Sequence, residues 1–122
     1  MKKIAKRSHL LLFVTPEYNS SVAPAVKNAY DWLSRPDPDF DNKSVIGGKC
    51  AAVLSTSYVG QTQVKDCEKM GEYWKLRYFS KPYYVNLGSG AFDEKGHVKS
   101  EAEKKKIIEW GGELISWVTQ NK

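Results

Sequence analysis

The sequence predicts an α/β domain in which three parallel strands alternate with crossover helices. Residues 10–14 and 50–54 are short apolar runs without polar alternation, which is typical of strands buried on both faces of a sheet, and a third strand is expected at residues 83–87, after Pro82. Each run precedes a segment with helical periodicity, and this order implies parallel pairing with right-handed crossovers. Residues 1–122 are therefore expected to form a single domain with helices on both faces of the sheet.

The first helix is expected over residues 24–34. Pro24 suits the first helical position, and Lys27 and Asp31 are spaced to pair on an exposed face. A second helix follows the strand at 50–54. Its expected apolar face consists of Val64, Cys67, Gly71, Trp74 and Tyr78.

The last helix is expected to begin near residue 100. Ser100 and Glu103 have the spacing of a capping box, in which a side chain accepts a hydrogen bond from the first helical turn. The residues expected on its buried face are Ile107, Gly111, Leu114, Ile115 and Val118.

Composition excludes several classes of protein. The longest apolar run is far shorter than the roughly 20 residues that span a bilayer, and no secretion signal follows the basic start. Cys50 and Cys67 are too few for a disulfide framework, so reduced thiols in a cytoplasmic protein are expected.

The basic character is local. Four of the five net positive charges lie in the first ten residues, which contain no acid, so the rest of the chain is nearly neutral. Attraction for nucleic acid is one interpretation of this segment and a solvated terminus is the other. We favour the terminus, because no basic stripe with interleaved aromatic residues continues into the domain.

Three polar loops follow the three strands, at 15–21, 55–60 and 88–97. Because the carboxyl ends of parallel strands meet at one edge of the sheet, we expect these loops to cluster and to bind the ligand.

The chemistry available to these loops is limited. His9 and His97 are the only histidines, and neither has metal-ligand spacing to a cysteine. No G-x-S-x-G nucleophile motif is present. Acid–base catalysis by Glu17 is an alternative, although no partner is visible in the sequence.

A flat aromatic ligand with a polar edge suits the first two loops better, and a flavin ring is such a ligand. The apolar faces would come from Pro16, Tyr18 and Tyr58, and the polar contacts from Asn19, Ser20, Thr56 and Ser57.

The run from Val14 to Arg35, V-T-P-E-Y-N-S-S-V-A-P-A-V-K-N-A-Y-D-W-L-S-R, resembles the signature of the NADPH-dependent FMN reductase family of flavodoxin-like proteins. Gly48-Lys49 and the segment 92–96 also resemble that family. The resemblance covers nearly the whole chain and implies a flavodoxin-like three-layer sandwich. It further implies an oxidoreductase that carries electrons from NAD(P)H through FMN to a quinone or a flavin.

By the same resemblance, the residues against FMN are Pro16, Glu17, Tyr18, Asn19, Ser20, Ser55, Thr56, Ser57, Tyr58 and Gly60. No catalytic side chain is implied, because the chemistry takes place on the flavin. Tyr58-Val59 stands where the family often has a pair of glycines or Gly-Arg.

The sequence starts where the third strand region of the family would start, so the first β-α-β unit, with the loop that holds the FMN phosphate, is expected to be missing. The fold is then a truncated one, with FMN bound weakly or not at all. The strand at 10–14 would have an unpaired edge, through which we expect a homo-oligomer or a partner chain. A non-catalytic interaction module, or one subunit of a flavoprotein complex, is the alternative function.

Overall fold

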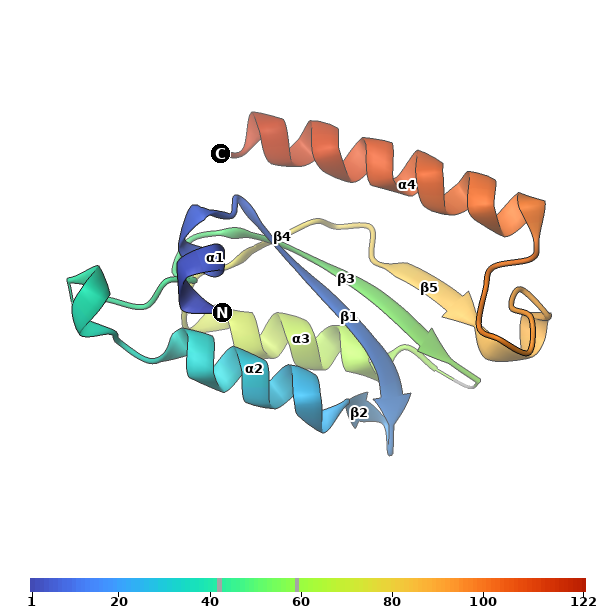
Figure 1. Ribbon diagram of the computed structural model, residues 1–122, viewed down its shortest axis with the longest axis horizontal. Coiled ribbons are helices and arrows are strands. Elements are labelled where there is room, and N and C mark those ends of the chain that lie inside the picture. Colours follow the sequence, from blue (N-terminus) through green and yellow to red (C-terminus); the bar gives the residue numbers. More distant parts are fainter. Residues whose placement is uncertain (42, 59) are drawn as a thin grey trace.

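The computed structural model describes residues 1–41, 43–58 and 60–122. Strands and helices alternate along most of the chain, and short 3₁₀ turns, η1 and η2, interrupt the connections (Figure 1). In chain order the elements are α1 (Lys2–Arg7), β1 (Leu10–Tyr18), β2 (Ser21–Val22), α2 (Pro24–Ser34), η1 (Pro38–Phe40), β3 (Cys50–Ser57), α3 (Thr62–Glu72), β4 (Arg77–Tyr78), β5 (Tyr83–Asn86), η2 (Leu87–Ser89) and α4 (Glu101–Gln120).

The central pair of the sheet is β1 and β3, which run parallel in register from Leu10 opposite Cys50 to Pro16 opposite Thr56. On its other side β3 pairs in parallel with β4 and then with β5, while β2 is an antiparallel hairpin partner of β1. The three predicted parallel strands are confirmed as β1, β3 and β5. The two-residue strands β2 and β4 are additions that are too short to leave a periodic signal.

Both central strands are longer than the apolar runs that predicted them. Residues 15–18 and 55–57, expected as loops, continue the strands because the main-chain pairing persists through polar residues. Pro16 is compatible with this pairing, because β1 lies next to another strand on one side only along residues 10–16.

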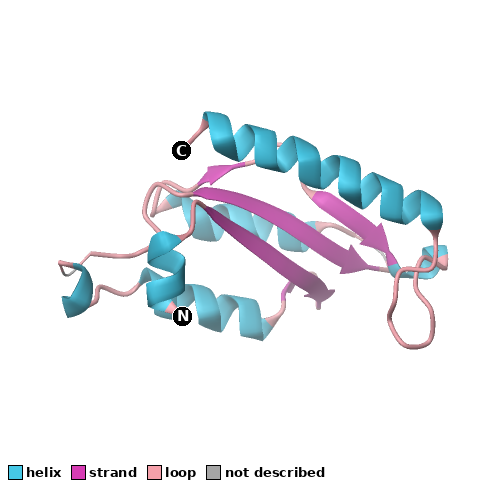
Figure 2. Ribbon diagram, turned by 45° about the horizontal axis from the view of Figure 1, so that its top comes forward, coloured by secondary structure: helices cyan, strands magenta, loops and turns pink. Residues whose placement is uncertain are grey.

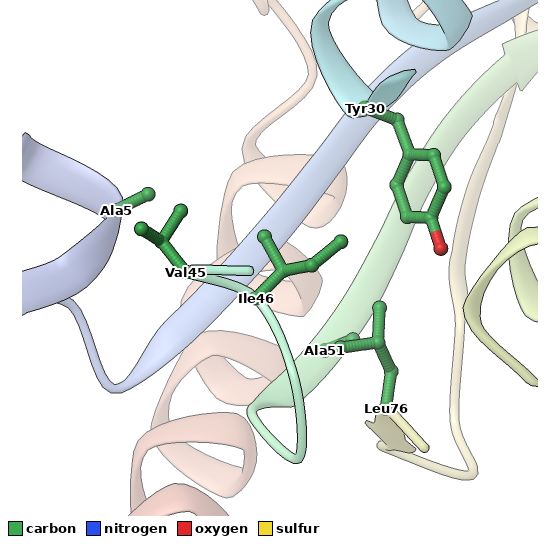
Figure 3. Packing of buried hydrophobic residues seen from close by; sticks show 6 residues of the cluster. All are labelled: Ala5, Tyr30, Val45, Ile46, Ala51 and Leu76. Atoms are coloured by element: carbon green, nitrogen blue, oxygen red, sulfur yellow. The ribbon is translucent and has the colours of Figure 1, made fainter. Parts of the chain in front are cut away.

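The sheet lies between two helical layers, α4 on one face and α2 with α3 on the other (Figures 1 and 2). Alternate strand residues serve the two layers. Cys50 and Ala52 pack with Leu114 and Val118 of α4, whereas Ala51 packs with Tyr30 of α2. Figure 3 shows the second cluster, which gathers Ala5, Tyr30, Val45, Ile46, Ala51 and Leu76 from several segments.

The basic N-terminus is a short helix rather than only a solvated end. In α1 the side chain of Ala5 is buried against Val45, Lys3 and Lys6 are exposed, and Lys2 pairs with Asp37 at 3.1 Å, so even this charged segment contributes one position to the core. No helix among the described residues is long and apolar enough to cross a membrane.

Two expectations about buried helix faces were wrong in part. Helix α3 ends at Glu72, and Lys75 adopts a left-handed conformation that turns the chain back, so Trp74 and Tyr78 lie outside the helix. In α4 the Ser100 cap is present, with its Oγ accepting from Glu103 N at 3.2 Å. Ile115 is 68 % exposed, however, because α4 faces the sheet through Leu114 and Val118.

Strand β1 is not buried on both faces as its composition predicted. Leu12 and Val14 are 44 % and 58 % exposed on the face that α4 covers only in part. Strand β3 does meet the expectation, since Cys50, Ala51, Ala52 and Val53 are all 2 % exposed or less.

Gly71 is required by close packing between α3 and β4. The Tyr78 hydroxyl donates to the carbonyl of Cys67, and a Cβ built on Gly71 would lie 2.5 Å from the Tyr78 ring. A methyl group at this position therefore has to displace the tyrosine from the core.

We expect Gly71→Ala to lower the free energy of unfolding by about 1–3 kcal/mol, because overpacking a core costs that much. The matched control is Gly112→Ala in α4, where a Cβ meets no atom within 4 Å. There the greater helix propensity of alanine should raise stability by up to about 1 kcal/mol. Urea unfolding measures both, and equal effects of the two changes would contradict the packing role.

Candidate functional site

The carboxyl ends of β1, β3 and β5 lie at one edge of the sheet, where the chain also begins helix α3 and turn η2 (Figure 1). The register places Pro16 beside Thr56, and Ser57 beside Asn86. The structure therefore brings together the first two predicted loops and the start of the third.

A tight hairpin turn follows β1. Asn19 and Ser20 have φ angles of 50° and 61°, and they lie between the paired residues Tyr18 and Ser21. Two successive left-handed residues are the geometry of a type I′ turn, which favours asparagine at these positions. The Tyr18 side chain is 57 % exposed at the end of the strand. Beneath the turn the buried Thr15 hydroxyl accepts a hydrogen bond from Ala23 N at 3.1 Å, which anchors the start of α2.

Glu17 connects the first loop to the second. Its carboxylate accepts hydrogen bonds from Ser57 Oγ and from Thr62 Oγ1, both at 2.5 Å. Ser57 Oγ in turn accepts from Gly60 N at 3.1 Å, so the network reaches the backbone of the second loop. These hydrogen bonds hold the pKa of Glu17 below its usual 4.5, with the Ser57 contact making the largest contribution.

The end of β3 presents its residues alternately. Ser55 and Ser57 are buried on the α3 side of the sheet, whereas Thr56 points to the other face and is half-buried. Tyr58 is 71 % exposed at the tip of the strand. Val59, which belongs to the predicted loop, lies outside the described residues.

Among the residues that the structure describes, two buried side chains near this edge have no hydrogen-bond partner. They are Ser55, through its Oγ, and Gln63, through both atoms of its amide. Buried polar groups usually bind a partner or an ordered water. Because Ser55 is fully buried, its hydroxyl faces the interior and not the open edge where a ligand would lie.

The end of β5 contributes residues that the sequence reasoning did not single out. Tyr84 Oη donates to the Ser57 carbonyl at 3.0 Å, and Asn86 Oδ1 accepts from Gly88 N at 2.7 Å. Tyr58 Cδ1 lies 3.9 Å from the position that a Cβ on Gly88 would occupy. Their position in the last strand, at the same carboxyl edge, was the available signal. The contact of Thr62 with Glu17 could not be predicted from the sequence either, because a threonine at the start of a helix gives no sign of a partner in a distant strand.

Other chemistries have less support. Among the described residues, no group of three or more His, Cys, Asp and Glu side chains is placed to hold a metal ion. Both cysteines are buried and free, and burial raises the pKa of the Cys67 thiol to about 12, which opposes a nucleophilic role.

This edge exposes the kinds of group that a flat aromatic ring with a polar rim binds. Tyr18 and Tyr58 expose aromatic area on the two loops, and the turn and strand ends between them carry hydroxyl, amide and main-chain groups. The same segments offer the phosphate of FMN no cationic side chain, because residues 15–21, 55–60 and 86–90 contain no lysine or arginine.

Residues 1–90 match the sequence profile of the NADPH-dependent FMN reductase family. The chain belongs to this family. A 2-hydroxy-1,4-benzoquinone reductase of a Burkholderia species is 34 % identical over 113 residues, which cover 88 % of this chain and 59 % of that protein. An NADPH:quinone oxidoreductase of Arabidopsis thaliana is 31 % identical over 102 residues, covering 80 % of this chain and 49 % of the relative.

Solved structures agree on the fold. FerB of Paracoccus denitrificans, a flavoenzyme NAD(P)H:(acceptor) oxidoreductase, superimposes with a TM-score of 0.78 at 25 % identity, covering 98 % of this chain and 66 % of FerB. A flavodoxin from the domain Archaea gives a TM-score of 0.69 at 6 % identity, covering 98 % of this chain and 71 % of that protein, which supports the flavodoxin-like fold alone. The chain thus spans about half to two thirds of the length of these relatives.

Proposed function

We propose that residues 1–122 form the flavin-ring site of an FMN-dependent NAD(P)H:acceptor oxidoreductase, with a quinone or a flavin as the acceptor. The proposal rests on the two loops at the carboxyl edge of the sheet, which are joined by the hydrogen bonds of Glu17 and each contain an exposed tyrosine. Family membership and the quinone reductases among the relatives support the choice of chemistry.

FMN, when bound, supplies the two-electron chemistry, accepting hydride from NAD(P)H and reducing the acceptor. The protein binds and orients the ring. Tyr18 and Tyr58 offer it aromatic surface, and the Asn19–Ser20 turn and Thr56 offer its edge polar groups. Three further residues fix the relative position of the two loops. Pro16 does so through its strand pairing with Thr56, and Ser57 and Gly60 do so through the hydrogen-bond network of Glu17.

Replacing Tyr18 tests the ring site. We expect Tyr18→Ala to raise the Kd for FMN about three- to tenfold, because an offset aromatic contact contributes about 0.5–1.5 kcal/mol. Lys27→Ala is the control: Lys27 pairs with Asp31 at 2.6 Å on an exposed helix face, and such pairs affect stability by only a few tenths of a kcal/mol. Quenching of flavin fluorescence measures both constants. A larger loss of binding from Lys27→Ala would overturn the assignment.

The three loop segments at the site contain no lysine or arginine, and this leads to a second prediction. FMN and riboflavin should bind residues 1–122 with Kd values within about threefold of each other, because a phosphate that stays in water without a partner adds little binding energy. Parallel titrations with the two flavins decide this. A preference for FMN of a hundredfold or more would mean that a phosphate site exists within these residues.

We also propose that the chain associates through the exposed edge of β1, with a second copy of the chain in preference to a different partner chain. Leu12 and Val14 are exposed along this edge, and an apolar groove of about 410 Å³ runs beside it. The groove is lined in part by Met1, Ile4, Phe13, Val26 and Leu33. An apolar strand with an unpaired edge is a template for pairing with another chain.

A charge at the centre of this edge should prevent the association. We expect the wild type to self-associate with increasing concentration in light scattering and Leu12→Lys to stay monomeric. Tyr73→Lys, which changes an 82 % exposed aromatic residue outside the β1 edge, should behave as the wild type. A wild type that remains monomeric at every concentration would contradict the proposal.

The groove also favours the alternative function, an interaction module or subunit that binds a partner without catalysis. The flavin titrations above separate the two, because a pure interaction module has no affinity for riboflavin or FMN. The free, buried cysteines support a reducing, cytoplasmic location.

A further inference from the structure

Two side chains connect the first loop to the second loop and to helix α3. Ser21 Oγ donates to Asp66 Oδ2 at 2.6 Å, and Glu17 accepts hydrogen bonds from both ends of the β3–α3 connection. Main-chain pairing between β1 and β3 ends at Pro16 and Thr56. Beyond that point, the side-chain hydrogen bonds between the described residues of 15–22 and 55–62 are the two that the Glu17 carboxylate accepts from Ser57 and Thr62.

These two contacts reach different parts of the second loop. Ser57 is the last residue of β3, and Thr62 is the first residue of α3. Glu17 therefore spans the whole connection between strand and helix. Gly60 lies within this connection, and a Cβ there would be 3.5 Å from each carboxylate oxygen, so the loop fits closely around the charge.

The position at a helix start makes the contact stronger. The N-cap residue of α3, Gln61, makes no capping hydrogen bond through its side chain. A carboxylate near the first turn of a helix is stabilised by the unpaired N–H groups and the positive end of the helix dipole. Glu17 therefore lies at this end of α3 through its hydrogen bond from the Thr62 hydroxyl.

Both carboxylate oxygens are engaged in these bonds, and the charged form is the one that accepts them. A general acid or base needs an oxygen that is available to a substrate proton. The geometry therefore opposes the acid–base role that the sequence left open for Glu17.

We propose that Glu17 is a positioning residue that fixes the β1–β2 turn relative to the β3–α3 loop, and thereby the spacing of the two loops that we assign to the flavin ring. The inference rests on the proposed function for the identity of the ring. We call the two hydrogen bonds that Glu17 accepts from Ser57 and Thr62 the brace. The brace is a property of the chain alone and can be measured without a ligand.

Thr62 is the best site for a test, because its removal breaks one arm of the brace while leaving Glu17 charged. Thr62→Ala deletes the hydroxyl, and Thr62→Ser restores it. Thr119→Ala is the matched control, since Thr119 Oγ1 donates only to the Ile115 carbonyl within α4. Alanine is a good helix former, so these variants are expected to fold.

Two readouts separate the brace from the function. In hydrogen exchange without ligand, Thr62→Ala should speed the amides of residues 18–21 and 60–62 about fivefold or more, with those of β3 unchanged. In flavin titration the same variant should raise the Kd about fivefold. Thr62→Ser and Thr119→Ala should match the wild type in both.

Unchanged exchange in Thr62→Ala would overturn the brace, whatever the flavin does. Faster exchange with an unchanged Kd would show that the loops are braced but that the brace does not set their spacing for the flavin ring, which also overturns the proposal. Absence of any flavin binding by the wild type would instead defeat the proposed function, and the brace would then be judged by exchange alone.

Discussion

The parallel pairing of β1 with β3 is the constraint on which the rest of the structure depends. Seven residue pairs in register, from Leu10 with Cys50 to Pro16 with Thr56, bring two segments forty residues apart to the same level. Because side chains alternate along a strand, this register also places Glu17 on the same face as Ser57. A shift of the β1–β3 register by one residue would place these two side chains on opposite faces of the sheet and break the hydrogen bond between the loops.

The same pairing sets the layers. One set of alternating residues packs on α4 and the other on α2 and α3, and β3, which is paired on both sides, is buried along Cys50–Val53. Strand β1 is paired on one side only along residues 10–16, and its Leu12 and Val14 side chains stay exposed on the face that α4 covers only in part. Strand β1 thus contributes to both surfaces. Its carboxyl end leads into the first loop of the candidate site, and its unpaired side forms the exposed edge that we propose as an interaction surface.

Sequence patterns could predict the elements that depend on local chemistry. The start of the helix at 24–34 is marked by Pro24, and the start of α4 is marked by the Ser100 cap. Patterns could not predict what tertiary pairing decides. Polar residues 15–18 look like a loop yet are strand, because a neighbouring strand pairs with them. Nor could they reveal the partners of Glu17, because Thr62 is forty-five residues away in the chain.

A titration of the ¹⁵N-labelled chain with riboflavin, followed by amide chemical shifts, locates the residues that bind the ring. We predict that the shifts concentrate at residues 15–21, 55–62 and 86–90, where β1, β3 and β5 end. Shifts centred instead on the groove beside β1, at Met1, Ile4 and Val26, or on the basic face of α1, would contradict this prediction.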